Sequence, residues 1–306
     1  IPVVIGVAAK SGFTRSRLLM PLVFAAALGG NLSLIGAPGN LIAQSALQNI
    51  GSGFGFFEYA KVGLPMLVCG ILYFLTIGYK FLPNNSNSSE VGSIGEQRDY
   101  SHVPRWKQIL SLVVLIATIL GMIFEKQTGI SLTVAGCIGA LVLVITGVLT
   151  EKQAYKAIDS QTIFIFGGTL ALAKALEMTG AGKLVADQVI GLLGNNSSPF
   201  MLLVVVFALS VVMTNFMSNT ATVALLVPVS LSIAAGMGAD PRAVLMATVI
   251  GSSCAYATPI GMPANMMVLS AGGYKFVDYA KSGIPLIIVS TIVSLILLPI
   301  LFPFHP

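Results

Sequence analysis

The sequence predicts an all-α polytopic membrane protein, and its composition and its long apolar runs both support this class. Hydrophobic residues make up 56% of the chain and charged residues only 9%, whereas a soluble domain carries about 25% charged residues. The mean hydropathy is +0.92. Four continuous apolar runs are long enough to cross about 30 Å of hydrocarbon; they are residues 62–82, 108–124, 130–149 and 283–303. A β-barrel is excluded because apolar and polar residues alternate in its strands.

The two ends of the chain repeat one pattern, which is built around a Gly-Pro-Asn break inside an apolar segment. The matched residues are Pro2 with Pro228, Gly12 with Gly238, Met20 with Met246, Gly36 with Gly261, Pro38 with Pro263, Asn40 with Asn265, Glu58 with Asp278, Tyr59 with Tyr279, Ala60 with Ala280, Lys61 with Lys281 and Pro65 with Pro285. Paired interruptions of this kind are typical of secondary transporters built from inverted repeats. The alternative is an old duplication kept for packing alone, but packing gives a membrane helix no reason to break twice at the same place.

The elements follow from this pattern in chain order. The first copy comprises a hairpin arm ending at residues 1–9, a half-helix at 16–29, a Gly-rich break at 30–39, a half-helix at 40–48 and a span at 62–82. A polar linker at 83–107 separates the copies. The second comprises spans at 108–124 and 130–149, an interfacial segment at 153–159, a Gly-interrupted apolar segment at 161–192, a re-entrant hairpin at 200–235, a broken helix at 243–271 and a last span at 283–303.

The chain is therefore divided into three parts. Residues 1–82 form the C-terminal part of a first repeat, 83–107 a cytoplasmic linker and 108–306 a second repeat. Because the chain begins at Ile1, without Met and inside an apolar stretch, we expect the rest of the first repeat to precede it.

The basic residues predict how the chain is oriented. When the loops are assigned alternately to two sides, the smaller group is Lys61, Lys126, Lys174, Lys183 and Arg242. The larger group is Lys10, Arg15, Arg17, Lys80, Arg98, Arg105, Lys107, Lys152, Lys156, Lys275 and Lys281. Cytoplasmic loops carry the excess of Lys and Arg, so we expect the larger group on the cytoplasmic side of the cell membrane and the C-terminus outside. Basic residues spread over membrane loops in this way do not indicate nucleic-acid binding.

The tip of the predicted hairpin is the most polar spot inside an apolar region. It reads MTNFMSNTAT over residues 213–222. Ser218 is a good N-cap for a helix beginning at Asn219, and the free N–H groups of a helix N-terminus suit an anion. The hydroxyl and carbonyl oxygens of the tip offer hard ligands for a small cation. The alternative is a set of polar groups that only satisfy one another between helices.

The two breaks offer a second kind of ligand. Their prolines free backbone carbonyls at 34–40 and 258–265, and unwound backbone is tolerated at membrane depth only where protein or a water-filled cavity satisfies it. The alternative is a simple proline kink.

The tip and both breaks contain no Asp, Glu, His, Lys or Arg. Lys174 and Glu177, three apart in 161–192, are expected to pair. Coupling to a metal cation such as Na⁺ is therefore favoured over proton coupling, which normally uses an intramembrane ionisable residue.

The cysteines and histidines do not suggest other chemistry. Cys69, Cys137 and Cys254 lie in separate apolar segments, and the two histidines lie in a polar loop and at the C-terminus. This spacing predicts neither a disulfide framework nor a zinc site. Motifs of intramembrane or hydrolytic enzymes such as HExxH and GxSxG are absent from the sequence, so we do not expect an enzyme.

The Ser-Asn-Thr tip at 218–220, followed by Pro228 and by a break that ends in Pro-Ala-Asn at 263–265, resembles the divalent anion:sodium symporters of the ion transporter superfamily. The resemblance covers the whole chain. It implies sodium-coupled transport of a dicarboxylate, citrate or sulfate by alternating access, with an elevator-like motion and a homodimer in the inner membrane. An arsenite or Na⁺/H⁺ exchanger of the same superfamily is the alternative.

The resemblance also implies site residues. The second Na⁺ site would comprise Thr214, the Met217 carbonyl, Ser218, Asn219 and the Gly261 carbonyl, and Gly36 would belong to a first Na⁺ site, whose Ser-Asn-Thr tip we expect upstream of Ile1. Substrate contacts would come from Asn219, Thr220, Ala37, Met262 and Pro263. Dicarboxylate carriers usually have Ser or Thr at the positions of Ala37 and Met262, which leaves sulfate or another oxyanion open.

Overall fold

The computed structural model describes residues 1–84, 103–158 and 198–304, with isolated positions between 163 and 188, and the regular structure in these parts is helical. It contains two compact units, one of residues 1–94 and 164–306 and the other of residues 95–163. The larger unit holds both copies of the Gly-Pro break. The predicted pair Lys174–Glu177 lies outside the described residues.

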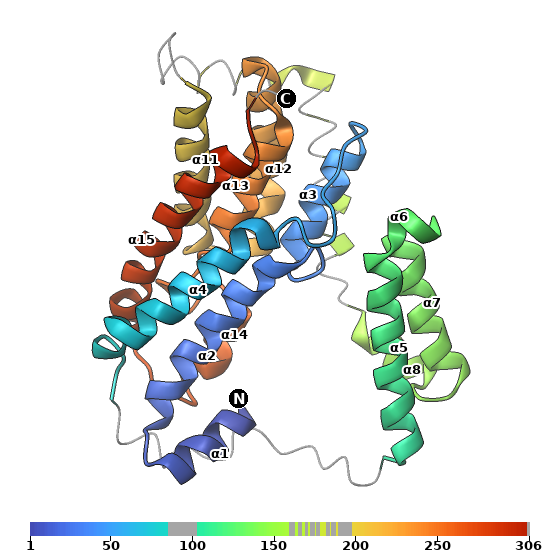
Figure 1. Cartoon of the computed structure of the whole chain (residues 1–306), viewed down its shortest axis with the longest axis vertical. Coiled ribbons are helices and arrows are strands. Elements are labelled where there is room, and N and C mark those ends of the chain that lie inside the picture. The colour runs from blue at the N-terminus through green and yellow to red at the C-terminus, as the bar shows by residue number, and fades with distance from the viewer. Residues whose placement is uncertain are drawn as a thin grey trace. The chain divides into compact units, whose positions relative to one another are not determined.

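In the first copy, the helices begin and end at the signals that the sequence carries. The elements are α1 (Pro2–Ser11), α2 (Arg15–Gly29), the 3₁₀ turn η1 (Gly30–Leu32), α3 (Pro38–Gln48), α4 (Ala60–Thr76) and the 3₁₀ turn η2 (Gly78–Lys80) (Figure 1). Pro38 is the first residue of α3, because proline has a suitable fixed φ and lacks an N–H that the first turn leaves unbonded anyway. The predicted span at 62–82 is shorter as a helix, since α4 ends at Thr76.

The second copy has the same order, and a helical hairpin precedes it. The hairpin is α11 (Pro199–Thr214) and α12 (Asn219–Met237), and the broken helix is α13 (Pro241–Ser252) and α14 (Pro263–Leu269), followed by α15 (Phe276–Leu301). Gly12 ends α1 with φ 73° and Gly238 ends α12 with φ 62°, so these matched glycines adopt the same left-handed cap. Pro263 begins α14 as Pro38 begins α3. The repeat predicted from residue types is thus also a repeat of backbone conformation.

The smaller unit is a helical hairpin of its own. It contains α5 (Arg105–Ile123), α6 (Glu125–Thr128), α7 (Leu132–Ile145) and α8 (Glu151–Ala157), with α5 and α7 side by side (Figure 1). Gly139 lets the two helices approach, because a Cβ there would overlap the Thr118 hydroxyl. The short α8 begins with a capping box formed by Thr150 and Gln153.

The two faces of α15 carry the kinds of side chain that are typical of a membrane-spanning helix. One face carries Ile284, Ile288, Ile292, Ile296 and Ile300, which are between 49% and 70% exposed. The face turned into the protein carries Ser282, Leu286, Ser290, Ser294 and Leu298, all buried. A water-soluble helix has the reverse pattern, whereas lipid-facing isoleucine and small polar residues between helices are typical of membrane bundles.

Within the described residues, α5, α12 and α15 have the length and composition to cross a membrane, and α4, α7 and α11 are shorter apolar helices. The predicted class, an all-α multi-pass membrane protein with broken helices and a helical hairpin, is confirmed.

Candidate functional site

The tip of the hairpin contains the capped N-terminus of α12. Ser218 is the N-cap of α12, and its Oγ accepts a hydrogen bond from the Ala221 N–H at 3.2 Å. The Asn219 Oδ1 accepts from the Thr220 N–H at 2.7 Å. The predicted start of a helix at Asn219 is confirmed. Its first residues are half-buried, so the positive end of α12 lies partly covered at the tip.

The tip is docked on the second break through Asn215. The Asn215 Nδ2 donates to the Cys254 carbonyl at 3.1 Å, and its Oδ1 accepts from the Ala257 N–H at 2.9 Å. The Asn215 carbonyl accepts from the Thr258 hydroxyl at 2.6 Å. Asn215 is 6% exposed and Thr258 is equally buried. Asn215 therefore joins the hairpin to the unwound backbone through its side-chain Nδ2, its side-chain Oδ1 and its backbone carbonyl.

Two of the predicted cation ligands meet at this junction. Gly261 is buried in the break, and a Cβ there would lie 2.5 Å from the Thr214 carbonyl and 2.9 Å from the Ala255 Cβ. The Thr214 hydroxyl, which is fully buried, donates to the Ser252 carbonyl. Thus Thr214 and Gly261 are in contact, and only glycine leaves room for the tip at position 261.

The other residues predicted for the second cation site follow on the same tip. Met217, Ser218 and Asn219 are half-buried in the segment that connects Thr214 to α12. The arrangement presents neutral carbonyl, hydroxyl and amide oxygens within a few residues of one another. Such hard, neutral oxygens are suited to a small alkali cation rather than to a transition metal. The described residues hold no group of three or more His, Cys, Asp or Glu residues that could bind a metal.

The first break is built in the same way. The Gly36 N–H donates to the Ser33 carbonyl at 3.1 Å, and a Cβ on Gly36 would overlap the Gly30 carbonyl. Gly36 is exposed, whereas its match Gly261 is buried. Ala37 is the N-cap of α3 and is half-buried.

The start of α3 packs against the hairpin. A Cβ on Gly39 would lie 2.9 Å from the Val223 Cγ2, and Val223 lies four residues after Asn219 in α12. The first turn of α3 therefore lies against α12 one turn beyond its start, and the two helices belong to different copies. Ala37 is the N-cap of α3, and Asn219 and Thr220 are the first residues of α12. Met262 and Pro263 lie at the start of α14, which packs against α2. No hydrogen bond among the described residues joins these five predicted substrate residues across elements.

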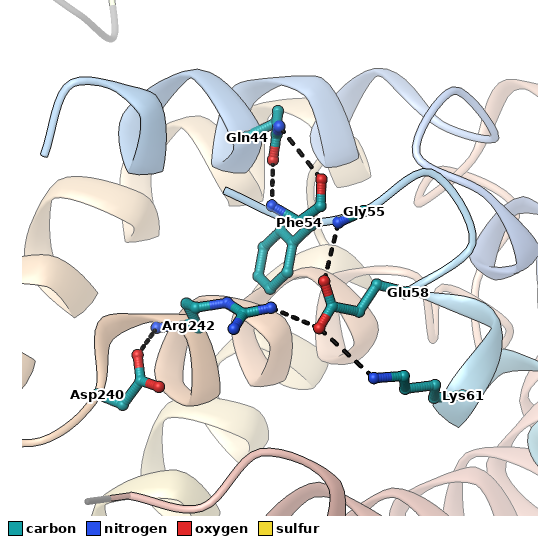
Figure 2. Close-up of polar contacts among 7 residues, drawn as sticks. All are labelled: Gln44, Phe54, Gly55, Glu58, Lys61, Asp240 and Arg242. Carbon is teal, nitrogen blue, oxygen red and sulfur yellow. Dashed lines mark hydrogen bonds and ion pairs between the residues drawn. The ribbon is translucent and has the colours of Figure 1, made fainter. Parts of the chain in front are cut away.

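The charged groups of this region lie apart from the tip and the breaks. Figure 2 shows Glu58, in the loop before α4, paired with Arg242 in the first turn of α13. The Glu58 carboxylate also lies 3.6 Å from the Lys61 Nζ. The Asp240 Oδ1 caps α13 by accepting from the Arg242 N–H at 2.8 Å. Arg242 and Ser252 are ten residue steps apart along α13, or about 15 Å at 1.5 Å per residue. The cluster ties the two copies together but does not supply charge to the candidate site.

Sequence reasoning missed Asn215 and Thr258 as functional residues. Both are polar residues in apolar surroundings, and that signal was visible. What the sequence does not record is that their partners lie 42 and 43 residues away. They are the residues that hold the tip on the break.

A helical hairpin whose polar tip docks on a broken helix, inside a multi-pass α-helical unit, defines a membrane carrier rather than an enzyme or a binding module. A family model described as citrate transporter matches residues 1–251 and also residues 119–305. The chain belongs to this family, and the predicted resemblance to divalent anion:sodium symporters is confirmed.

The individual relatives are also transporters. The chain is 30% identical to an uncharacterized transporter of Methanocaldococcus jannaschii over 300 residues, which is 96% of this chain and 66% of the relative. It is 35% identical to an uncharacterized transporter of Escherichia coli over 171 residues, or 56% of the chain and 28% of the relative. It is 25% identical to a sodium-dependent dicarboxylate transporter of Staphylococcus aureus over 309 residues, or 94% and 59%. The chain thus covers less than two thirds of the length of these relatives.

Proposed function

We propose that this protein is a sodium-coupled secondary transporter of a small divalent anion. The observation that carries the proposal is the docking of the hairpin tip on the second break through Asn215, Thr214 and Gly261. A carrier must have a site that forms and opens between rigid elements, and a helical tip held on unwound backbone by hydrogen bonds provides such a site.

The cation site is proposed at this junction. Its ligands are the Thr214 side chain, the carbonyls of Met217 and Gly261, and the side chains of Ser218 and Asn219. Gly36 occupies the matching position of the first break and is assigned to a first Na⁺ site. Since neither the tip nor the breaks contain an ionisable side chain, a metal cation rather than a proton is the coupling ion. The sodium dependence that the name of the Staphylococcus aureus relative states supports this assignment.

The anion is proposed to bind at the starts of α3 and α12. The N-terminus of a helix carries about half a positive charge, which favours an anion. The substrate contacts are Asn219 and Thr220, with Ala37, Met262 and Pro263 from the two breaks. Bound Na⁺ would offset part of the substrate's charge.

The substrate class is proposed to be a dicarboxylate or sulfate. The matched family is described as citrate transporter and the Staphylococcus aureus relative as a dicarboxylate transporter, which favours a carboxylate. Ala37 and Met262 lack the hydroxyl that would donate to a carboxylate, and this departure keeps sulfate as a candidate.

The whole candidate site lies in the larger unit. We propose that the site alternates between the two sides of the membrane by an elevator-like motion, within a homodimer. The proposed location is the inner membrane with the C-terminus outside, following the distribution of basic residues.

Uptake into proteoliposomes tests the proposed function. We expect labelled succinate or sulfate to accumulate when an inward Na⁺ gradient is imposed and to stop accumulating when choline replaces Na⁺. Accumulation of either anion at the same rate without Na⁺ would refute the sodium coupling, and failure to take up both anions and citrate would refute the substrate class.

A further inference from the structure

Both breaks are held by an asparagine at the third position of the half-helix that follows them. The Asn265 Nδ2 donates to the carbonyls of Ala255 at 2.8 Å and Thr258 at 2.9 Å. In the first copy, the Asn40 Nδ2 donates to two break carbonyls at the matching positions, those of Gly30 at 3.2 Å and Ser33 at 2.9 Å. Each amide thus ties the half-helix back to the unwound backbone before it.

A buried tyrosine holds each asparagine in turn. The Tyr279 hydroxyl donates to the Asn265 carbonyl at 2.6 Å, and the Tyr59 hydroxyl donates to the Asn40 carbonyl at 3.3 Å. All four residues are 0% exposed. Tyr279 lies in the first turn of α15, and Tyr59 is the N-cap of α4, so each of these matched helices anchors the break of its own copy.

Each of these helices also has a glycine where the break crosses it. A Cβ on Gly283 of α15 would overlap the Tyr256 carbonyl, and one on Gly63 of α4 would overlap the Asn31 carbonyl. Tyr256 and Asn31 are matched positions of the two breaks. The asparagine, the tyrosine and the glycine together form a support that occurs once in each copy.

The asparagines are not explained by packing alone. Since both acceptors of each Nδ2 are carbonyls, the orientation of each amide is fixed, and the Oδ1 atoms of Asn40 and Asn265 are left buried with no hydrogen-bond partner in the described structure. A buried unsatisfied oxygen is destabilising. An apolar residue of the same size would avoid that cost, so the two donated hydrogen bonds must offset it.

The second support is linked directly to the candidate cation site through Thr258. The Thr258 carbonyl accepts from Asn265, while its hydroxyl donates to the Asn215 carbonyl and accepts from the Gly261 N–H at 3.2 Å. Asn265 therefore holds the turn that binds the Gly261 N–H and that receives the hairpin tip. We propose that Asn265, held by Tyr279, is a positioning residue that sets the affinity of the cation site. The proposal rests on the proposed function, because it requires Na⁺ to bind at this junction.

Thermal stabilisation of the purified protein by Na⁺, with choline as the reference cation, tests this role without requiring transport. Asn265→Leu keeps the branched shape and the number of side-chain heavy atoms and removes both donated hydrogen bonds. We expect its half-saturating Na⁺ concentration to rise at least tenfold, which corresponds to about 1.4 kcal/mol, while the stabilisation at saturating Na⁺ is retained. Tyr279→Phe removes one hydrogen bond, and we expect a rise of about threefold.

The matched control is Gln44→Met. Gln44 is another buried amide with two backbone hydrogen bonds, both to Phe54, but it lies outside the breaks (Figure 2). We expect this variant to unfold at a lower temperature and to keep a half-saturating Na⁺ concentration within twofold of the wild type.

The outcomes separate the two proposals. If Na⁺ stabilises the wild type and Asn265→Leu responds like Gln44→Met, the positioning role is wrong and the cation site stands. If Asn265→Leu does not fold, Tyr279→Phe decides, and an unchanged half-saturating concentration there overturns the role. If Na⁺ does not stabilise the wild type beyond choline, the proposed cation site fails, and the positioning role fails with it.

Discussion

Replacing Gly261 by alanine probes the junction between the hairpin tip and the second break. The added Cβ would lie 2.5 Å from the Thr214 carbonyl oxygen and 2.9 Å from the Ala255 Cβ. The first neighbour is a backbone atom and the second is the methyl group of an alanine, so neither can rotate away. The overlap can be removed only if the tip moves away from the break. Overpacking a filled site costs about 1–3 kcal/mol, and a cost of that size on the closed site corresponds to about a five- to 150-fold loss of affinity.

The assay is Na⁺-dependent anion uptake into proteoliposomes. We expect Gly261→Ala to require at least fivefold more Na⁺ for half-maximal uptake, because the added Cβ displaces the tip from the break at the proposed cation site. Gly6→Ala is the matched control, since a Cβ on Gly6 in α1 would meet nothing within 4 Å. That control should transport as the wild type does. Wild-type Na⁺ dependence in Gly261→Ala would refute the placement of the cation site at this junction.

Three further predictions concern the proposed transport cycle. Asn219→Ala should abolish Na⁺-dependent uptake while the protein still folds, and uptake within twofold of the wild type would remove Asn219 from the site. Uptake should follow a Na⁺ gradient and not a proton gradient, because the tip and breaks lack ionisable side chains; accumulation driven by protons in Na⁺-free buffer would contradict this. Met262→Thr adds one donor, and a hydrogen bond to a charged group contributes about 1.5–3 kcal/mol. The ratio of succinate to sulfate uptake should therefore rise at least tenfold, and an unchanged ratio would indicate that backbone N–H groups already supply the contact.

The local features of this fold could be predicted from the sequence because their causes are local. Ser218 caps α12, Pro38 and Pro263 begin the half-helices after the breaks, and Gly12 and Gly238 end their helices in the left-handed conformation. Each of these follows from the chemistry of one residue and its immediate neighbours. The repeat itself was visible because both copies kept these same local signals.

The contacts that assemble the site could not be predicted in the same way. Asn215 meets the break 39 to 43 residues further on, and Arg242 meets Glu58 across 184 residues. Such pairings depend on how the helices pack, which the periodicity of a single segment does not encode. Asn265 could be recognised from the sequence as part of a repeated motif. Its two hydrogen bonds to the break could be seen only in the structure.

Equilibrium binding of radiolabelled Na⁺ to the purified protein tests the central claim most directly, with the wild type compared with Thr214→Val. Valine keeps the shape of threonine and removes the hydroxyl that lies at the junction of tip and break. The account predicts saturable binding to the wild type, competed by unlabelled Na⁺ but not by choline, and at least tenfold weaker binding to the variant. Absence of saturable binding to the wild type, or equal binding to both proteins, would contradict it.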